Sequence, residues 1–197
     1  MAIYFQVVRG DSATSSGLRM LASQLGLTVT TISTGRFIAV TGRYKVLLSI
    51  GSALVATAIG LLSLLDTNTS WLQIYGTLAI GGSGYGFMFV STNISAQASV
   101  EKRDIAVVIG LNTFVRLVGS TLGLAIASAL LNSGLERRLP LAIPTTYVSD
   151  ILNSPEAIHG SLPVEYVETV QQVYADSLKD IWHVISGLAG LGMLLVS

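Results

Sequence analysis

The chain has 197 residues, of which 51% are hydrophobic and only 11% are charged, and its formal net charge is zero. A soluble domain usually carries about 25% charged residues, so this composition argues against an ordinary soluble protein, and the balanced charge indicates no nucleic-acid partner. Cysteine is absent, which excludes a disulfide framework and any site that needs a cysteine ligand or nucleophile.

Long apolar stretches with few charged residues predict five membrane-spanning helices. A helix needs roughly 20 apolar residues to cross a ~30 Å hydrocarbon core, and helical backbone satisfies its own polar groups in lipid. A buried core of a soluble protein is the alternative, but too little polar sequence remains to cover so many helices. We therefore expect an all-α, polytopic membrane helix bundle. Residues 1–131 supply four spans and the fifth looks truncated, with predicted bounds 16–40, 46–65, 72–95, 105–131 and 181–197.

The connection 132–180 holds all four prolines and most of the acidic residues, and it is predicted to be an extracellular loop. Within it, apolar residues recur at helical spacing over 162–179, with acidic residues between them. This pattern predicts a short amphipathic helix before the last span. The sequence allows two placements for this helix: at the membrane interface, or packed against the other helices.

The positive-inside rule sets the orientation of the bundle. Arg43 and Lys45 lie in the first connection, and Lys102 and Arg103 lie in the third, whereas the second has no basic residue and the fourth is mostly acidic. The first and third connections should therefore face the cytoplasm. We expect a multi-pass integral protein of the plasma membrane.

Polar side chains inside the predicted spans are the candidate site. Arg116 lies about eleven positions into the fourth span, where a charge is costly and by default indicates function; the alternative is that its side chain snorkels to the cytoplasmic interface. Asn112 precedes Arg116 by four residues on the same helix face, and Asn93 and Gln97 share the same spacing in the third span. Gln24 stands among apolar residues of the first span. These residues either bridge helices by hydrogen bonds or form one polar seam that faces a cavity.

Titratable partners for this seam are missing from the spans. No Asp or Glu lies in any predicted span, so the chain offers Arg116 no intramembrane carboxylate. There is also no HExxH motif, no GxSxG motif and no cluster of His, Asp and Glu. The sequence therefore predicts no enzyme, no cofactor and no metal site, and it indicates that part of the polar site comes from elsewhere.

Glycines are frequent, with 20 in the chain, and the stretch GTLAIGGSGYGF (76–87) is the densest. A nucleotide-binding loop would need a strand before it and a helix after it, but this stretch lies inside a long uncharged run. We interpret these glycines, and the pair Gly119 and Gly123, as positions where membrane helices approach closely. A flexing role during transport is the alternative.

The stretch GRFIAVTGRYK (35–45) resembles the cytoplasmic loop motif of the major facilitator superfamily, which runs Gly-x-x-x-Asp-Arg-x-Gly-Arg-Arg/Lys. Ala39 and Val40 stand where the family has its Asp and Arg, which is typical of a degenerate copy in the C-terminal half. The positions that carry the motif are Gly35, Gly42, Arg43 and, one place late, Lys45.

Three further stretches narrow the resemblance. IYFQVVRGDSATSSGLRML, RLVGSTLGLAIASAL (which contains Arg116) and YADSLKDIWHV are similar to the fourteen-helix drug:proton antiporter branch, especially its fungal toxin and multidrug efflux members. The resemblance covers nearly the whole chain and implies helices ten to fourteen of such a transporter.

The resemblance implies a function and its partners. The chain would be the C-terminal portion of a proton-coupled efflux transporter that exports drugs, toxins or secondary metabolites, with small organic substrates, protons and the lipid bilayer as partners. The polar residues of the spans would line the substrate cavity, and the proton-carrying carboxylate would lie in helices outside this chain. The alternative is a non-transporting truncated bundle, or a partner of a full-length pump.

Overall fold

The computed structural model describes residues 1–65, 69–153 and 162–196, and in these ranges the chain forms helices and no β-strand. This confirms the predicted all-α class. In chain order the helices are a π-helical turn η1 (Tyr4–Val8), α1 (Ala13–Arg19), α2 (Leu21–Thr41), α3 (Tyr44–Leu62), α4 (Trp71–Ala98), a short 3-10 turn (Lys102–Asp104), α5 (Ile105–Ala142), α6 (Thr145–Asn153) and α8 (Val164–Val196).

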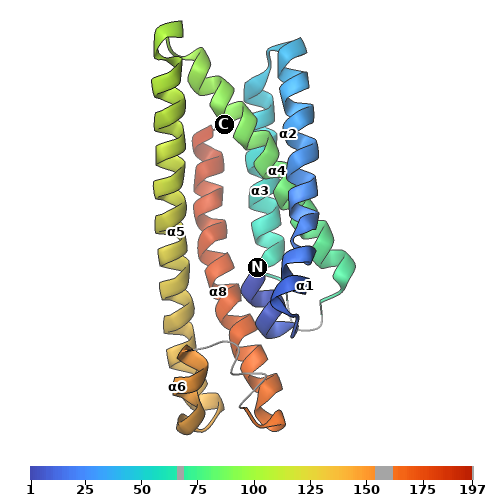
Figure 1. The fold of residues 1–197 in the computed structure, drawn as a ribbon, viewed down its shortest axis with the longest axis vertical. Helices are drawn as coiled ribbons and strands as arrows, with labels where there is room; N and C mark the ends of the chain where they lie inside the picture. Colours follow the sequence, from blue (N-terminus) through green and yellow to red (C-terminus); the bar gives the residue numbers. More distant parts are fainter. Residues whose placement is uncertain (66–68, 154–161, 197) are drawn as a thin grey trace.

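The long helices run along the longest axis of the molecule, and α4 crosses the bundle at a slant (Figure 1). α4 packs against both α2 and α3, while α8 packs against α3 and α5. The α2–α3 and α4–α5 connections lie at one end of the bundle, at the top of Figure 1, and α6 lies at the other end. Because α4 leans toward α5 only at the upper end, the two helices meet there and diverge below.

Glycines allow α4 to lie directly against its neighbours. A Cβ atom added to Gly82 would fall on the carbonyl oxygen of Ser23 in α2, and one added to Gly86 would fall on the Oγ1 of Thr30. On another side of α4, a Cβ on Gly84 would come within 2.8 Å of α3. The glycine-rich stretch is thus a close-packing surface on both sides, as the sequence predicted.

The pair Gly119 and Gly123 behaves differently, because a Cβ atom at either position would meet no other atom within 4 Å. Both lie in the half of α5 that is covered least, where large apolar residues such as Phe114 and Leu122 are exposed. Within the described residues, close packing therefore explains three central glycines of α4 but finds no partner for Gly119 and Gly123 of α5.

Five hydroxyl groups in α2 form hydrogen bonds within the helix, whereas the buried Oγ1 of Thr31 has no partner among the described residues. Their Oγ atoms donate to backbone carbonyls four residues earlier at 2.6–2.8 Å, in Thr28, Thr30, Ser33, Thr34 and Thr41. Such hydrogen-bonded residues lower the hydropathy of a helix without leaving their own hydroxyl groups unpaired.

By length and hydropathy alone, two stretches of the described chain qualify as membrane spans, Tyr44–Leu62 and Lys102–Ala142. The membrane boundaries of all five predicted spans stay predictions.

The helices differ from the sequence-based ranges in three places. The first predicted span, 16–40, is divided at Met20 into α1 and α2. Residues 132–142 continue α5 as helix, although we expected the extracellular loop to begin at 132. The amphipathic segment 162–179 is no separate short helix, because α8 runs on without a break from Val164 to Val196. Residues 154–161 of the expected loop lie outside the described residues.

Packing explains why these segments are helical. Leu131, Leu135 and Leu139 recur every four residues on α5 and are buried, so they extend the helix past its apolar half. Buried residues on α8 follow the same period from Val170 to Ile181. The two buried faces meet, and together with α6 and η1 they form a core at the lower end of the bundle. We call the part formed by 131–153 and 162–181 the α5–α6–α8 lobe.

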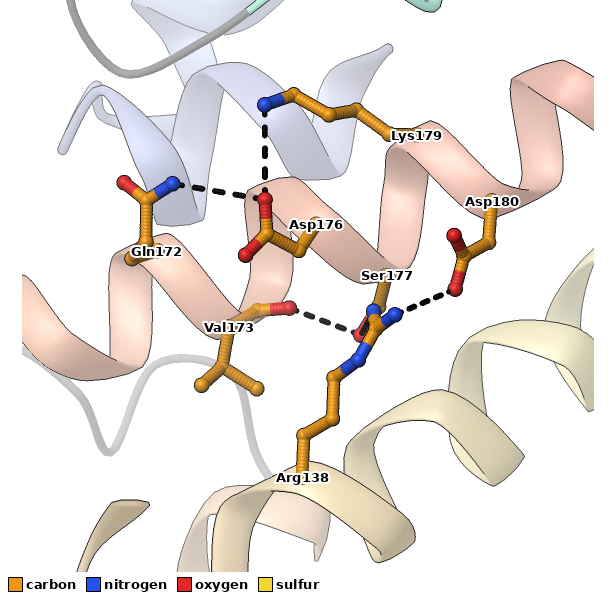
Figure 2. A network of polar contacts seen from close by, with 7 residues as sticks. All are labelled: Arg138, Gln172, Val173, Asp176, Ser177, Lys179 and Asp180. Carbon is orange, nitrogen blue, oxygen red and sulfur yellow. Dashed lines mark hydrogen bonds and ion pairs between the residues drawn. The ribbon is translucent and has the colours of Figure 1, made fainter. Parts of the chain in front are cut away.

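A polar network joins α5 to α8 in this lobe (Figure 2). The Nη2 atom of Arg138 lies 2.7 Å from the Oδ2 of Asp180, and its Nη1 donates to the Oγ of Ser177 at 3.2 Å. The Ser177 hydroxyl in turn donates to the carbonyl of Val173 at 2.8 Å. Ser177 also faces Gly134, where an added Cβ would lie 3.1 Å from the serine Cβ. The helices therefore approach closely at Gly134, and Arg138 spans the contact one turn further on.

Candidate functional site

A pocket of about 260 Å³ lies where α4 and α5 meet, and we call it the α4–α5 pocket. α4 contributes one face of its helix, because Tyr85, Phe89 and Asn93 are spaced four residues apart. The α5 residues Asn112 and Arg116 have the same spacing. The complete lining is Tyr85, Met88, Phe89, Thr92, Asn93, Asn112, Val115 and Arg116.

Two asparagines connect the helices at this pocket. The Nδ2 atom of Asn112 donates to the Oδ1 of Asn93 at 3.0 Å. Asn93 is held in turn by its own Nδ2, which donates to the carbonyl of Phe89 at 2.8 Å. The asparagine of α4 thus uses its donor within its helix and presents its acceptor to α5.

Arg116 supplies the only formal charge among the residues that line the α4–α5 pocket. Its guanidinium carbon lies 4.5 Å from the ring centroid of Phe89, a cation–π distance. Among the described residues, the ion pairs involve Arg19, Arg103, Arg138 and Lys179, and none involves Arg116. The pocket therefore combines one uncompensated positive charge with aromatic walls and amide groups.

The structure brings together three of the five polar residues that the sequence singled out, namely Asn93, Asn112 and Arg116. Gln97 lies one turn beyond Asn93 on α4, is partly buried and does not line the pocket. Gln24 is exposed on α2, beside the point where Ser23 touches α4, and also lies outside the pocket. Within the described chain, the five residues therefore do not form a single polar seam.

The cytoplasmic loop motif forms a tight turn between α2 and α3. Gly42 ends α2 with a left-handed φ of 67°, a conformation that glycine adopts without steric cost. Arg43 precedes α3 and its backbone N–H donates to the Oγ1 of Thr41 at 3.3 Å, while Lys45 lies in the first turn of α3. Gly35 lies inside α2 with open space around it. In the described chain neither Arg43 nor Lys45 forms an ion pair.

Sequence reasoning missed the aromatic walls of the pocket, Tyr85 and Phe89, although their spacing from Asn93 could have indicated a shared face. It also missed a second polar cluster at the lower end of the bundle. There the Arg19 Nη2 atom lies 2.9 Å from Asp11 Oδ1, its Nη1 donates to the Tyr75 hydroxyl at 2.8 Å, and its guanidinium carbon lies 3.8 Å from the centroid of Trp71. This cluster fastens the N-terminal segment to α4.

Comparisons with known proteins agree on one family. The model of the Major Facilitator Superfamily matches residues 1–124. An uncharacterised MFS-type transporter of Mycobacterium tuberculosis is 33% identical over 194 residues, which is 98% of this chain and 28% of the relative. The MFS-type transporter gkaD of Penicillium citrinum is 30% identical, covering 100% of this chain and 35% of the relative.

A third relative, the MFS-type efflux pump elcC of Phaeosphaeria nodorum, is 29% identical over 198 residues, with 98% of this chain and 34% of the relative covered. The chain thus spans about a third of the length of the curated relatives it matches. No solved structure gave a significant match to the chain.

Proposed function

This chain belongs to the major facilitator superfamily, and on that premise we propose that it forms the C-terminal portion of a proton-coupled efflux transporter. The transporter would export small organic molecules such as drugs, toxins or secondary metabolites across the plasma membrane. Membership of the family makes the chain an integral membrane protein and points to a transporter rather than an enzyme.

The α4–α5 pocket is the one observation that supports this proposal beyond family membership. Asn93, Asn112 and Arg116 come from different helices and converge on one cavity. Polar residues in a membrane bundle that share a cavity mark pathways for substrates or ions. Two of the relatives above are named as an efflux pump and a transporter, which supports the direction and the type of process.

Each predicted residue has a proposed part in this function. Arg116, Asn112 and Asn93 would contact substrate in the pocket, and Gln97 and Gln24 would line the wider cavity once the remaining helices of the transporter are in place. The proton-carrying carboxylate would come from helices outside residues 1–197.

The loop motif has a proposed part in the transport cycle. Such motifs lie at the cytoplasmic ends of two helices and would stabilise one state of the rocking cycle. Gly42 would set the tight turn, and Arg43 and Lys45 would pair with acidic groups or helix ends of the remaining helices.

The test is transport by the native full-length gene product in proteoliposomes. We expect an imposed pH gradient to drive accumulation of organic dyes, and a protonophore to abolish it. Residues 1–197 alone, reconstituted in the same way, should give no gradient-driven flux. Flux that ignores the pH gradient would contradict proton coupling, and gradient-driven flux from the 197-residue chain alone would contradict its assignment as a portion of the transporter.

A further inference from the structure

We infer that the α4–α5 pocket selects a planar organic anion, such as an aromatic carboxylate, and that Arg116 is the residue that recognises its charge. The inference rests on the proposed transport function, because it names the chemical class of substrate for the same pocket.

Arg116 places a positive charge deep inside the predicted fourth span. Ile105 begins α5, and eleven residues at 1.5 Å each put Arg116 about 17 Å from that end, so a span that begins at 105, as predicted, has Arg116 near the middle of its ~30 Å hydrocarbon core. A cation at this depth is costly unless it has a partner. The described residues give Arg116 the ring of Phe89 but no carboxylate. An anionic ligand would supply the missing counter-charge.

The guanidinium group of Arg116 has hydrogen-bond donors to offer a ligand. Its carbon lies 4.5 Å from the centroid of the Phe89 ring, and within the described residues its N–H groups donate no hydrogen bond, so they remain available at the pocket. An arginine held in this way is suited to two parallel hydrogen bonds with a carboxylate, which a lysine ammonium cannot reproduce. The geometry favours a carboxylate or a similar flat oxyanion over a neutral acceptor.

The aromatic walls of the pocket favour a flat ligand. The rings of Tyr85 and Phe89 lie 6.3 Å apart between centroids and are tilted by 32°, and both are partly exposed at the pocket. A planar ring can stack against Tyr85 beside the charged group. The cavity of about 260 Å³ lies just below the range of roughly 300–1,000 Å³ that is usual for small-molecule sites. It would therefore hold the charged aromatic end of a larger molecule.

Two neutral side chains of the pocket can also donate hydrogen bonds. Asn112 donates one Nδ2 hydrogen to the Oδ1 of Asn93, and its other Nδ2 hydrogen is available at the pocket. Thr92 lines the pocket and is exposed. In the described chain its hydroxyl forms none of the bonds to backbone that satisfy the threonines of α2. Two neutral donors thus accompany Arg116, an arrangement complementary to an anion.

The test is equilibrium binding to the native full-length protein in phosphatidylcholine nanodiscs. The probes are a coumarin carboxylate and its neutral ethyl ester, two planar fluorophores that differ chiefly in charge. We expect the carboxylate to bind about tenfold more tightly than the ester, since charge-assisted hydrogen bonds are roughly twice as strong as neutral ones. Equal affinity of the wild type for the two probes, or binding of neither, would overturn the inference without using any variant.

Variants assign the preference to Arg116. Arg116→Gln should remove the preference, Arg116→Lys should keep only part of it, and Arg137→Gln, which removes an exposed cation from the same helix, should keep it in full. An unchanged preference in Arg116→Gln would overturn the assignment. Loss of carboxylate binding when anionic phosphatidylglycerol is added would identify a lipid headgroup as the anion and would likewise overturn it.

The outcome is separable from that of the proposed function. Binding is measured without a proton gradient, so an anion preference can be found even if gradient-driven transport fails. Conversely, the protein could show gradient-driven transport of dye and yet bind ester and carboxylate equally. That result would support the transporter assignment and contradict only the inferred substrate class.

Discussion

Asn112 on α5 donates a hydrogen bond of 3.0 Å to Asn93 on α4, and this is the direct side-chain bond between the two helices at the α4–α5 pocket. The backbones of α4 and α5 are joined at the top of Figure 1 and diverge below it. The bond thus links the two helices through amides that are nineteen positions apart in sequence.

The asparagine bond should be measurable by a double-mutant cycle with Asn93→Leu, Asn112→Leu and the double variant. Hydrogen bonds between helices in membranes contribute about 0.6 kcal/mol on average and rarely exceed ~1.7 kcal/mol. We expect a coupling energy in that range from chemical unfolding of the native protein in mixed micelles. Strictly additive effects of the two substitutions would show that the amides do not interact.

A second prediction uses the glycines of α4. Gly82→Ala places a methyl group against the backbone carbonyl of Ser23, which cannot move without shifting α2, so we expect a loss of about 1–3 kcal/mol in unfolding free energy. Gly76→Ala is the matched control, because the same helix offers open space there. The control should be neutral or stabilise by up to about 1 kcal/mol. Equal effects at both positions would contradict the close packing of α4 on α2.

The sequence predicted the helices and grouped Asn93, Asn112 and Arg116, together with Gln97 and Gln24, for the same reason. Four-residue spacing identifies the face of a helix, and two polar faces in consecutive helices joined by a short turn are brought together by the fold. The same reasoning does not say which neighbour covers a face. Gln24 shares the polar character of the other residues but lies on a helix that approaches α4 elsewhere.

The α5–α6–α8 lobe could not be predicted in the same way. Glu136, Arg137 and Arg138 follow directly on the apolar half of α5, and charge of that density suggests the end of a span. The helix continues because Leu135 and Leu139 are buried against α8, a tertiary contact that local composition does not reveal. For a similar reason the Arg19 cluster was not predicted, since its members come from segments far apart in sequence.

A third prediction separates charge from packing at the contact between α5 and α8. Asp180→Asn weakens an ion pair whose side chains are 37% and 61% exposed, so we expect a loss below about 1 kcal/mol that fades at high salt. Gly134→Leu forces bulk against Ser177, so it should cost about 1–3 kcal/mol at any salt concentration. Unfolding titrations at low and high salt distinguish the two. A larger and salt-independent loss for Asp180→Asn would contradict this ranking.

The last prediction concerns Tyr174, which lies in the α5–α6–α8 lobe before the predicted last span and is 2% exposed. Its hydroxyl donates to the carbonyl of Ile151 at 3.4 Å, and burial raises the pKa of Tyr174 from 10.0 to about 12. Between these values the unfolded chain loses the phenolic proton while the folded chain keeps it. The contribution of Tyr174 to stability is therefore complete below pH 10 and declines as the pH rises toward about 12.

Tyr174→Phe is the appropriate comparison, because it removes the titrating group and keeps the ring. The unfolding free energy of the wild type should fall relative to this variant by up to about 1.4 kcal/mol per pH unit above pH 10. Other tyrosines titrate in both proteins and cancel in the difference. Phenolate absorbance gives a second readout, since the folded wild type should ionise one tyrosine later than the unfolded chain does. Parallel stability curves for the two proteins across this pH range would show that Tyr174 is not held in its neutral form by the packing of α6 and α8.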